Sequence, residues 1–322
     1  MSGQLKLACL LIALFVSALL CVQIGAVPLT WSALVNPAVD NGMTQQILFE
    51  LRLPRLLLGL LAGASLALCG GLLQELSRNQ LADPYLFGIV AGAAFGATVA
   101  TIWAPAQQVA LPIAAFIGAV VAIVLVIGFV SINRRNQLEH VVLAGVAVSF
   151  LLSSLGSALL YMGDAFAANR IMFWLMGSLA RAEMTAIWVI SPVLIITILV
   201  ICYWRRELAA LHFSDTTARS LGVQVNQIRF GLLLCTAALT AVVVAYCGGI
   251  GFIGLLVPHL IRFWLGNSPL PMLLGSAMAG ALLLIWVDAA ARTLVADQEV
   301  PLGVLTSAIG SLFFLALLAR RR

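Results

Sequence analysis

Long apolar segments fill this chain almost from end to end, and they leave it few folds to adopt. Most approach the roughly 20 residues that a helix needs to cross the apolar core of a bilayer. With 63% hydrophobic and only 9% charged residues, the chain lacks the polar surface of a soluble domain. We therefore predict an all-α, polytopic membrane protein with about ten transmembrane helices. The segments run roughly 6–27, 51–75, 86–104, 110–131, 140–162, 186–204, 230–248, 254–265, 271–292 and 302–319.

Basic residues predict the orientation of these helices. With the N-terminus inside, the outside connections hold five of the seventeen Lys and Arg residues, Arg52, Arg55, Arg170, Arg181 and Arg292. The other twelve fall inside, as the positive-inside rule expects. We therefore place both termini in the cytoplasm and treat residues 1–322 as a single transmembrane domain. The net charge of +5 then reflects topology, and we expect no nucleic-acid partner.

One stretch, GGIGFIGLLVPHLIR at 248–262, breaks the helical pattern. Its glycines loosen the backbone and its proline removes a hydrogen-bond donor, so lipid cannot surround it. We expect a short broken helix near 248–265 that is buried in protein or lines a watery cavity. The spacing G-x-G-x-x-G also occurs here, but a nucleotide site would need an acidic residue about 20 positions on, and none is present. We interpret five residues as packing positions: Gly248, Gly249, Gly251, Gly254 and Pro258.

Two connections predict structure of their own. The outside connection 164–185 holds an apolar stretch too short to span, so we expect a re-entrant or interfacial helix there. The inside connection 205–229 is polar, and Ser214 or Asp215 can cap a short helix that stops near Gly222. Its pattern fits a partner surface and a solvated connector equally well.

The residue inventory limits the chemistry. Lys6 is the only lysine, and no G-x-x-x-x-G-K-[ST] motif occurs, so this chain cannot hydrolyse ATP through a P-loop. The six cysteines lie in apolar runs without a C-x-x-C pair. We interpret them as small buried side chains and predict neither a metal site nor a cofactor in this chain.

Eight motifs, taken together and in this order, cover nearly the whole chain. They are RLPR at 52–55, RNQLADP at 78–84, LAGV at 143–146, FWLMGSL at 173–179, ARSLG at 218–222, GGIGFIGLLVPHLIR at 248–262, DAAAR at 288–292 and EVPLGVLTSAIG at 299–310. With them the chain resembles the permease subunits of binding-protein-dependent ABC importers, of type II, for iron–siderophore chelates, haem and vitamin B12. One departure is Gln80, where that family usually has proline.

The resemblance implies partners and site residues. It implies a second permease subunit as a homodimer, two cytoplasmic ATPase subunits that bind ATP and Mg, and a periplasmic or surface substrate-binding protein. The location implied is the bacterial cytoplasmic (inner) membrane. Arg52, Arg55 and Arg292 would dock the binding protein. The loop 205–229 would couple to the ATPase, through Asp215, Ala218, Arg219, Ser220, Leu221 and Gly222. The cytoplasmic gate would involve Asn79, Leu81, Gln137 and Leu138.

Alternatives from the residues themselves remain. Asp288 could serve an ion-coupled secondary transporter, because a charge in a span is costly unless it is paired or near water. Ser65 and His259 could form a nucleophile and base, as in an intramembrane protease. Arg52 and Arg55 could simply anchor a helix end at the membrane interface.

Overall fold

The computed structural model describes residues 3–25, 42–104, 110–132, 138–295 and 298–320. Within these ranges the regular structure is helical, apart from one isolated bridge between Val295 and Gln298. The predicted all-α class is therefore confirmed.

Eight helical runs in the described part of the chain are long and apolar enough to cross a membrane. They are α1 (Gly3–Gln23), the run Met43–Ser77, α6 (Ala110–Ile132), α7 (Leu138–Met162), α9 (Met184–Tyr203), α12 (Val225–Cys247), α14 (Pro269–Ala291) and α15 (Leu302–Arg320). Two shorter apolar helices, α5 (Ile89–Trp103) and α13 (Ile253–Leu265), complete the set. Each of the ten predicted apolar segments thus coincides with a helix, and the chain is a multi-pass membrane protein.

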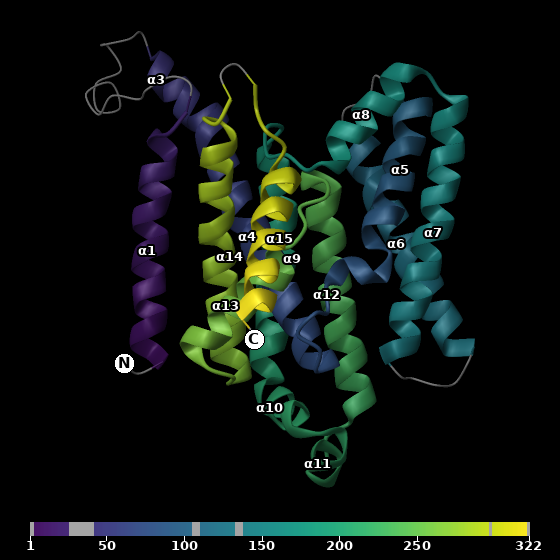
Figure 1. Ribbon diagram of the computed structural model, residues 1–322, viewed down its shortest axis with the longest axis vertical. Helices are drawn as coiled ribbons and strands as arrows, with labels where there is room; N and C mark the ends of the chain where they lie inside the picture. Colours follow the sequence, from purple (N-terminus) through teal and green to yellow (C-terminus); the bar gives the residue numbers. More distant parts are fainter. Residues whose placement is uncertain (1–2, 26–41, 105–109, 133–137, 296–297, 321–322) are drawn as a thin grey trace.

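The remaining helices are short. The run Met43–Ser77 consists of α3 (Met43–Gln46), a π-helical turn η2 (Ile47–Arg52) and α4 (Leu53–Ser77). A 3₁₀ turn, η3 (Pro84–Phe87), precedes α5, and α8 (Ala165–Leu175) lies in the predicted outside connection. The predicted inside connection forms α10 (Arg205–Phe213) and α11 (Asp215–Ser220). Figure 1 shows α8 and α10–α11 at opposite ends of the molecule, with the N- and C-terminal ends toward the α10–α11 end.

Among the described residues, helix packing forms two large apolar cores and a small third cluster around Cys21, Ile285 and Ala289. One large core is built around α4, α9, α12 and α14, and the other around α5, α6 and α7. Glycine permits the closest crossings: a Cβ on Gly63 of α4 would lie 2.3 Å from the Gly280 carbonyl oxygen of α14. In the second core a Cβ on Gly92 would lie 2.3 Å from the Gly118 carbonyl oxygen. Close approach through small residues is how helices associate in lipid.

Apolar side chains also cover much of the outer surface of three spans. Little of α1, α7 or α15 is buried within this chain, and large residues such as Phe150 and Leu312 are exposed. Such faces suit lipid or another membrane-embedded subunit.

Candidate functional site

The segment α10–α11 projects beyond the ends of the spans (Figure 1). Ser214 separates its two helices, and the Ser214 hydroxyl accepts a hydrogen bond from the Thr217 amide at 2.9 Å. The segment ends at Gly222 in the left-handed region, with φ +80°. The short helix predicted here is present, with the predicted cap and stop.

The residues predicted to couple to an ATPase have different surroundings. Ala218 is buried, whereas Arg219, Ser220 and Gly222 are exposed. Leu221, the residue directly after α11, is 69% exposed. An exposed leucine on this polar segment fits both a partner surface and a solvated connector.

Asp215 holds this segment against the spans. Its carboxylate accepts hydrogen bonds from Arg229 at 2.9 and 3.1 Å and from Arg78 at 2.6 Å. Arg78 also donates to the Leu211 carbonyl at 2.8 Å. The hydrogen bonds from Arg229, and then those from Arg78, lower the pKa of Asp215. Asp215 therefore anchors the segment.

The predicted gate residues are only partly described. Asn79 and Leu81 lie just past α4, where the Asn79 side-chain oxygen accepts from the Leu81 amide at 2.9 Å. Leu81 is exposed. Leu138 begins α7, and Gln137 lies outside the described residues. Arg78, which precedes Asn79, forms hydrogen bonds to Leu211 of α10 and to Asp215 of α11.

The broken helix predicted near 248–265 consists of a non-helical passage, residues 248–252, followed by α13, and it continues directly from α12. Gly248 and Phe252 both have positive φ, +71° and +67°. Tyr85 supplies hydrogen bonds to the backbone of Ile250, which lies outside either helix. Its hydroxyl donates to the Ile250 carbonyl at 2.8 Å and accepts from the Ile250 amide at 3.0 Å. Gly248 and Ile250 are buried, whereas Gly249, Gly251 and Phe252 are partly exposed, so this chain encloses the break only in part.

The glycines of this break are not equivalent. A Cβ on Gly248 would lie 2.1 Å from the Trp174 carbonyl oxygen, and one on Gly249 would lie 2.6 Å from that of Leu175. A Cβ on Gly254 would lie 3.1 Å from the Leu66 carbonyl oxygen. At these three positions a side chain would lie close to the backbone of another segment. At Gly251 the nearest atom would be Ser307 Oγ at 3.8 Å, an ordinary contact, so tight packing does not explain that glycine.

A polar cluster that the sequence analysis did not single out lies near the α10 end of α4. Glu75 Oε2 lies 2.7 Å from His212 Nδ1, and Glu75 Oε1 lies 3.1 Å from Arg262 Nη2. Arg262 also donates to the side-chain oxygen of Gln74, whose amide donates to the Gly254 carbonyl at 3.0 Å. The signal in the sequence was two polar residues, Gln74 and Glu75, at the end of an otherwise apolar run.

The three arginines predicted to dock a binding protein lie at the end of the molecule opposite to α10–α11. They form hydrogen bonds to other groups of this chain. Arg55 contacts Asp288 at 2.9 Å and Glu299 at 2.7 Å. Arg292 contacts Asp288 at 3.2 Å, the i,i+4 pair that the sequence indicated.

Arg52 and Arg292 also bind the end of α1. Arg52, only 7% exposed, donates to the Val22 and Gln23 carbonyls at 2.8 and 2.9 Å. Arg292 donates to the Ile24 carbonyl at 3.0 Å. The last carbonyls of a helix have no intrahelical donor and carry its negative dipole end. These two arginines therefore join α1 to α4 and α14, a role that the sequence analysis did not anticipate.

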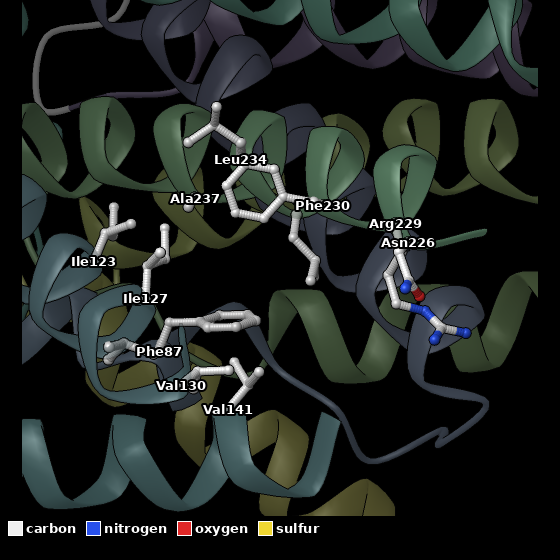
Figure 2. Close-up of a pocket in the computed structure, with 12 residues that line it drawn as sticks. Phe87, Ile123, Ile127, Val130, Val141, Asn226, Arg229, Phe230, Leu234 and Ala237 are labelled. Carbon is white, nitrogen blue, oxygen red and sulfur yellow. The ribbon is translucent and has the colours of Figure 1, made fainter. Parts of the chain in front are cut away.

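A cavity of about 410 Å³ lies between η3, α6, α7 and α12. Figure 2 shows apolar side chains around it, among them Phe87, Ile127 and Phe230, with Asn226 and Arg229 to one side. Its residues offer no His, Cys, Asp or Glu to a metal. More widely, the described residues contain no group of three such side chains that could hold a metal ion.

Comparisons with known proteins match almost the whole chain. The model of the FecCD transport family matches residues 10–320. The chain is 39% identical to the hemin transport system permease protein HmuU of Yersinia pestis, over 99% of this chain and 96% of that protein. It is 36% identical to the Fe(3+) dicitrate transport system permease protein FecD of Escherichia coli, over 97% of each. A solved metal-chelate type ABC transporter in an inward-facing conformation superposes with a TM-score of 0.88 at 31% identity, covering 98% of this chain and 99% of that one.

Proposed function

Because this chain belongs to the FecCD transport family, we propose that it is the permease subunit of an ABC importer that moves a metal chelate through a membrane. The cargo we propose is an iron–siderophore chelate, haem or cobalamin. The energy would come from ATP, bound with Mg and hydrolysed on a partner subunit. The assembly would contain two copies of this chain, two ATPase subunits and one external binding protein, in the bacterial cytoplasmic membrane.

The observation that carries the ATP-driven part of this proposal is the α10–α11 segment. It presents exposed Leu221 directly after α11 and is fixed to the spans through Asp215. A rigidly mounted, partly apolar projection suits a groove on another protein. The exposed apolar faces of α7 and α15 support a second membrane-embedded copy.

The alternatives lose support from the same geometry. Asp288 is 3% exposed and forms ion pairs with both Arg55 and Arg292. Because these two arginines already balance its negative charge, the carboxylate is poorly placed to bind a coupling ion. Ser65 is fully buried, which gives water no access for hydrolysis. The His259 ring packs against Phe263 and Phe313, as expected of a core residue.

The cargo can be identified through the binding protein encoded beside this chain. That protein would be titrated with ferric siderophores, haem and cobalamin, and each complex would then be added to the permease–ATPase assembly in lipid. We expect one chelate class to bind tightly and to stimulate ATP hydrolysis only together with the binding protein. Equal stimulation by the empty protein and by every chelate would contradict the proposed cargo class.

A further inference from the structure

The start of α13 has a carbonyl group that its own helix does not satisfy. In an α-helix the Gly254 carbonyl would accept from the amide four residues later, and that residue is Pro258. Proline has no amide hydrogen. Gln74 of α4 supplies the missing donor, at 3.0 Å. A buried carbonyl without a donor is costly, so this contact fixes the first turn of α13 to α4.

The same glutamine begins a chain of polar contacts that ends on α10. Arg262, one turn beyond Pro258, donates to the Gln74 side-chain oxygen and contacts Glu75 at 3.1 Å. Glu75 in turn lies 2.7 Å from His212 of α10. The Glu75 and Arg262 side chains are only 5% and 11% exposed. We call these four side chains, His212, Glu75, Arg262 and Gln74, the polar relay.

The polar relay costs desolvation energy that a purely apolar contact would avoid. Burying an ion pair is often no more stabilising than apolar packing, whereas removing one partner is strongly destabilising. Helix packing between α4 and α13 is already provided by close approach, since a Cβ on Gly70 would lie 2.0 Å from the Gly254 carbonyl oxygen. What the polar relay adds is a direct connection between α10 and the broken helix.

We propose that the polar relay makes α10 and the first turn of α13 move together, so that displacement of α10–α11 shifts the break at 248–252. Pro258 is part of this device because it leaves the Gly254 carbonyl available to Gln74. His212, Glu75, Arg262 and Gln74 act as positioning residues. The inference rests on the proposed function only where import is measured.

The first test separates coupling from stability. Pro258→Ala returns an amide donor to the Gly254 carbonyl, so that this carbonyl no longer depends on Gln74. We expect it to keep the melting temperature while lowering chelate imported per ATP hydrolysed by up to about tenfold, the effect of roughly one neutral hydrogen bond. Pro192→Ala, the same change inside α9, should leave that ratio unchanged. Equal coupling in the parent and Pro258→Ala assemblies, or equal loss in Pro192→Ala, would overturn the proposal.

A second test needs neither ATPase nor cargo. Hydrogen exchange of the permease in lipid would be followed at residues 253–257 after Glu75→Gln or His212→Phe. We expect exchange there to rise about tenfold, because the relay is cut at its α10 end. Glu50→Gln, in the same Met43–Ser77 run but at its far end, should leave exchange unchanged. Unchanged exchange in both relay variants would refute the linkage. A parent assembly that fails to import on ATP would refute the proposed function alone.

Discussion

Near the start of α4, the charged side chains form ion pairs with one another. Arg55 has two carboxylates, of which Asp288 is buried and Glu299 is 46% exposed at the side chain. The hydrogen bond from Arg55 is the main cause of the lowered pKa of Glu299, so this carboxylate stays charged near neutral pH. A partner carboxylate that binds Arg55 must therefore compete with Glu299, and docking at this site becomes an exchange of ion pairs.

Removing that competitor should strengthen docking. In Glu299→Gln permease, assembled with its ATPase, we expect the binding protein to associate faster than with the parent, because the Arg55 fork becomes available to a bidentate carboxylate. Arg55→Glu should slow association, and both effects should shrink as salt is added. Glu183→Gln, an acidic residue just before α9, serves as control. Association rates that are the same in the parent, Glu299→Gln and Arg55→Glu assemblies would remove Arg55 from the docking site.

A second prediction at the residue scale concerns how the contribution of Asp215 to stability depends on pH. Its pKa lies below the usual 3.8 because of Arg229 and Arg78. A carboxyl whose pKa is lowered by folding stabilises the native state above the unfolded value and loses that contribution as pH falls through the folded one. We expect Asp215→Asn to melt earlier than the parent at neutral pH, and this gap to persist down to about pH 4 and close below it. If the difference in melting temperature between the parent and Asp215→Asn disappeared between pH 8 and pH 6, a group other than Asp215 would be its cause.

At the scale of elements, α10–α11 has an interior side and an exterior side. Ala218 and Asp215 face the spans, whereas Leu221 faces away. Mutations on the two sides should therefore have different effects. Changes on the inner side loosen the segment, and changes on the outer side affect only what binds to it.

We therefore expect Leu221→Glu permease to insert and melt like the parent but to lose binding-protein-stimulated ATP hydrolysis and import. A charge would have to be desolvated in the groove that receives the leucine. Leu221→Ile, which keeps the apolar volume, should retain most activity. If the Leu221→Glu assembly hydrolyses ATP and imports at the parent rate, α10–α11 is only a connector.

Across the whole molecule, hydropathy alone predicted where the helices lie, because each apolar segment must satisfy its backbone internally in lipid. The i,i+4 pair of Asp288 and Arg292 and the cap at Ser214 were also local enough to predict. The contacts that give the sites their character were not. Arg55 and Glu299 are 244 residues apart, and Gln74 and Gly254 are 180 apart. One sequence carries no record of which distant polar residues meet, although Pro258 does indicate that the carbonyl four residues earlier needs another donor.

Uptake into sealed proteoliposomes that contain this permease and its ATPase tests the proposed ATP-driven import most directly. The chelate-loaded binding protein would be added outside, with either internal Mg-ATP or an imposed proton gradient. We expect accumulation with internal ATP, none with the gradient alone, and none when the binding protein is omitted. Gradient-driven accumulation by the permease without its ATPase would contradict ATP-driven import and would restore the ion-coupled transporter.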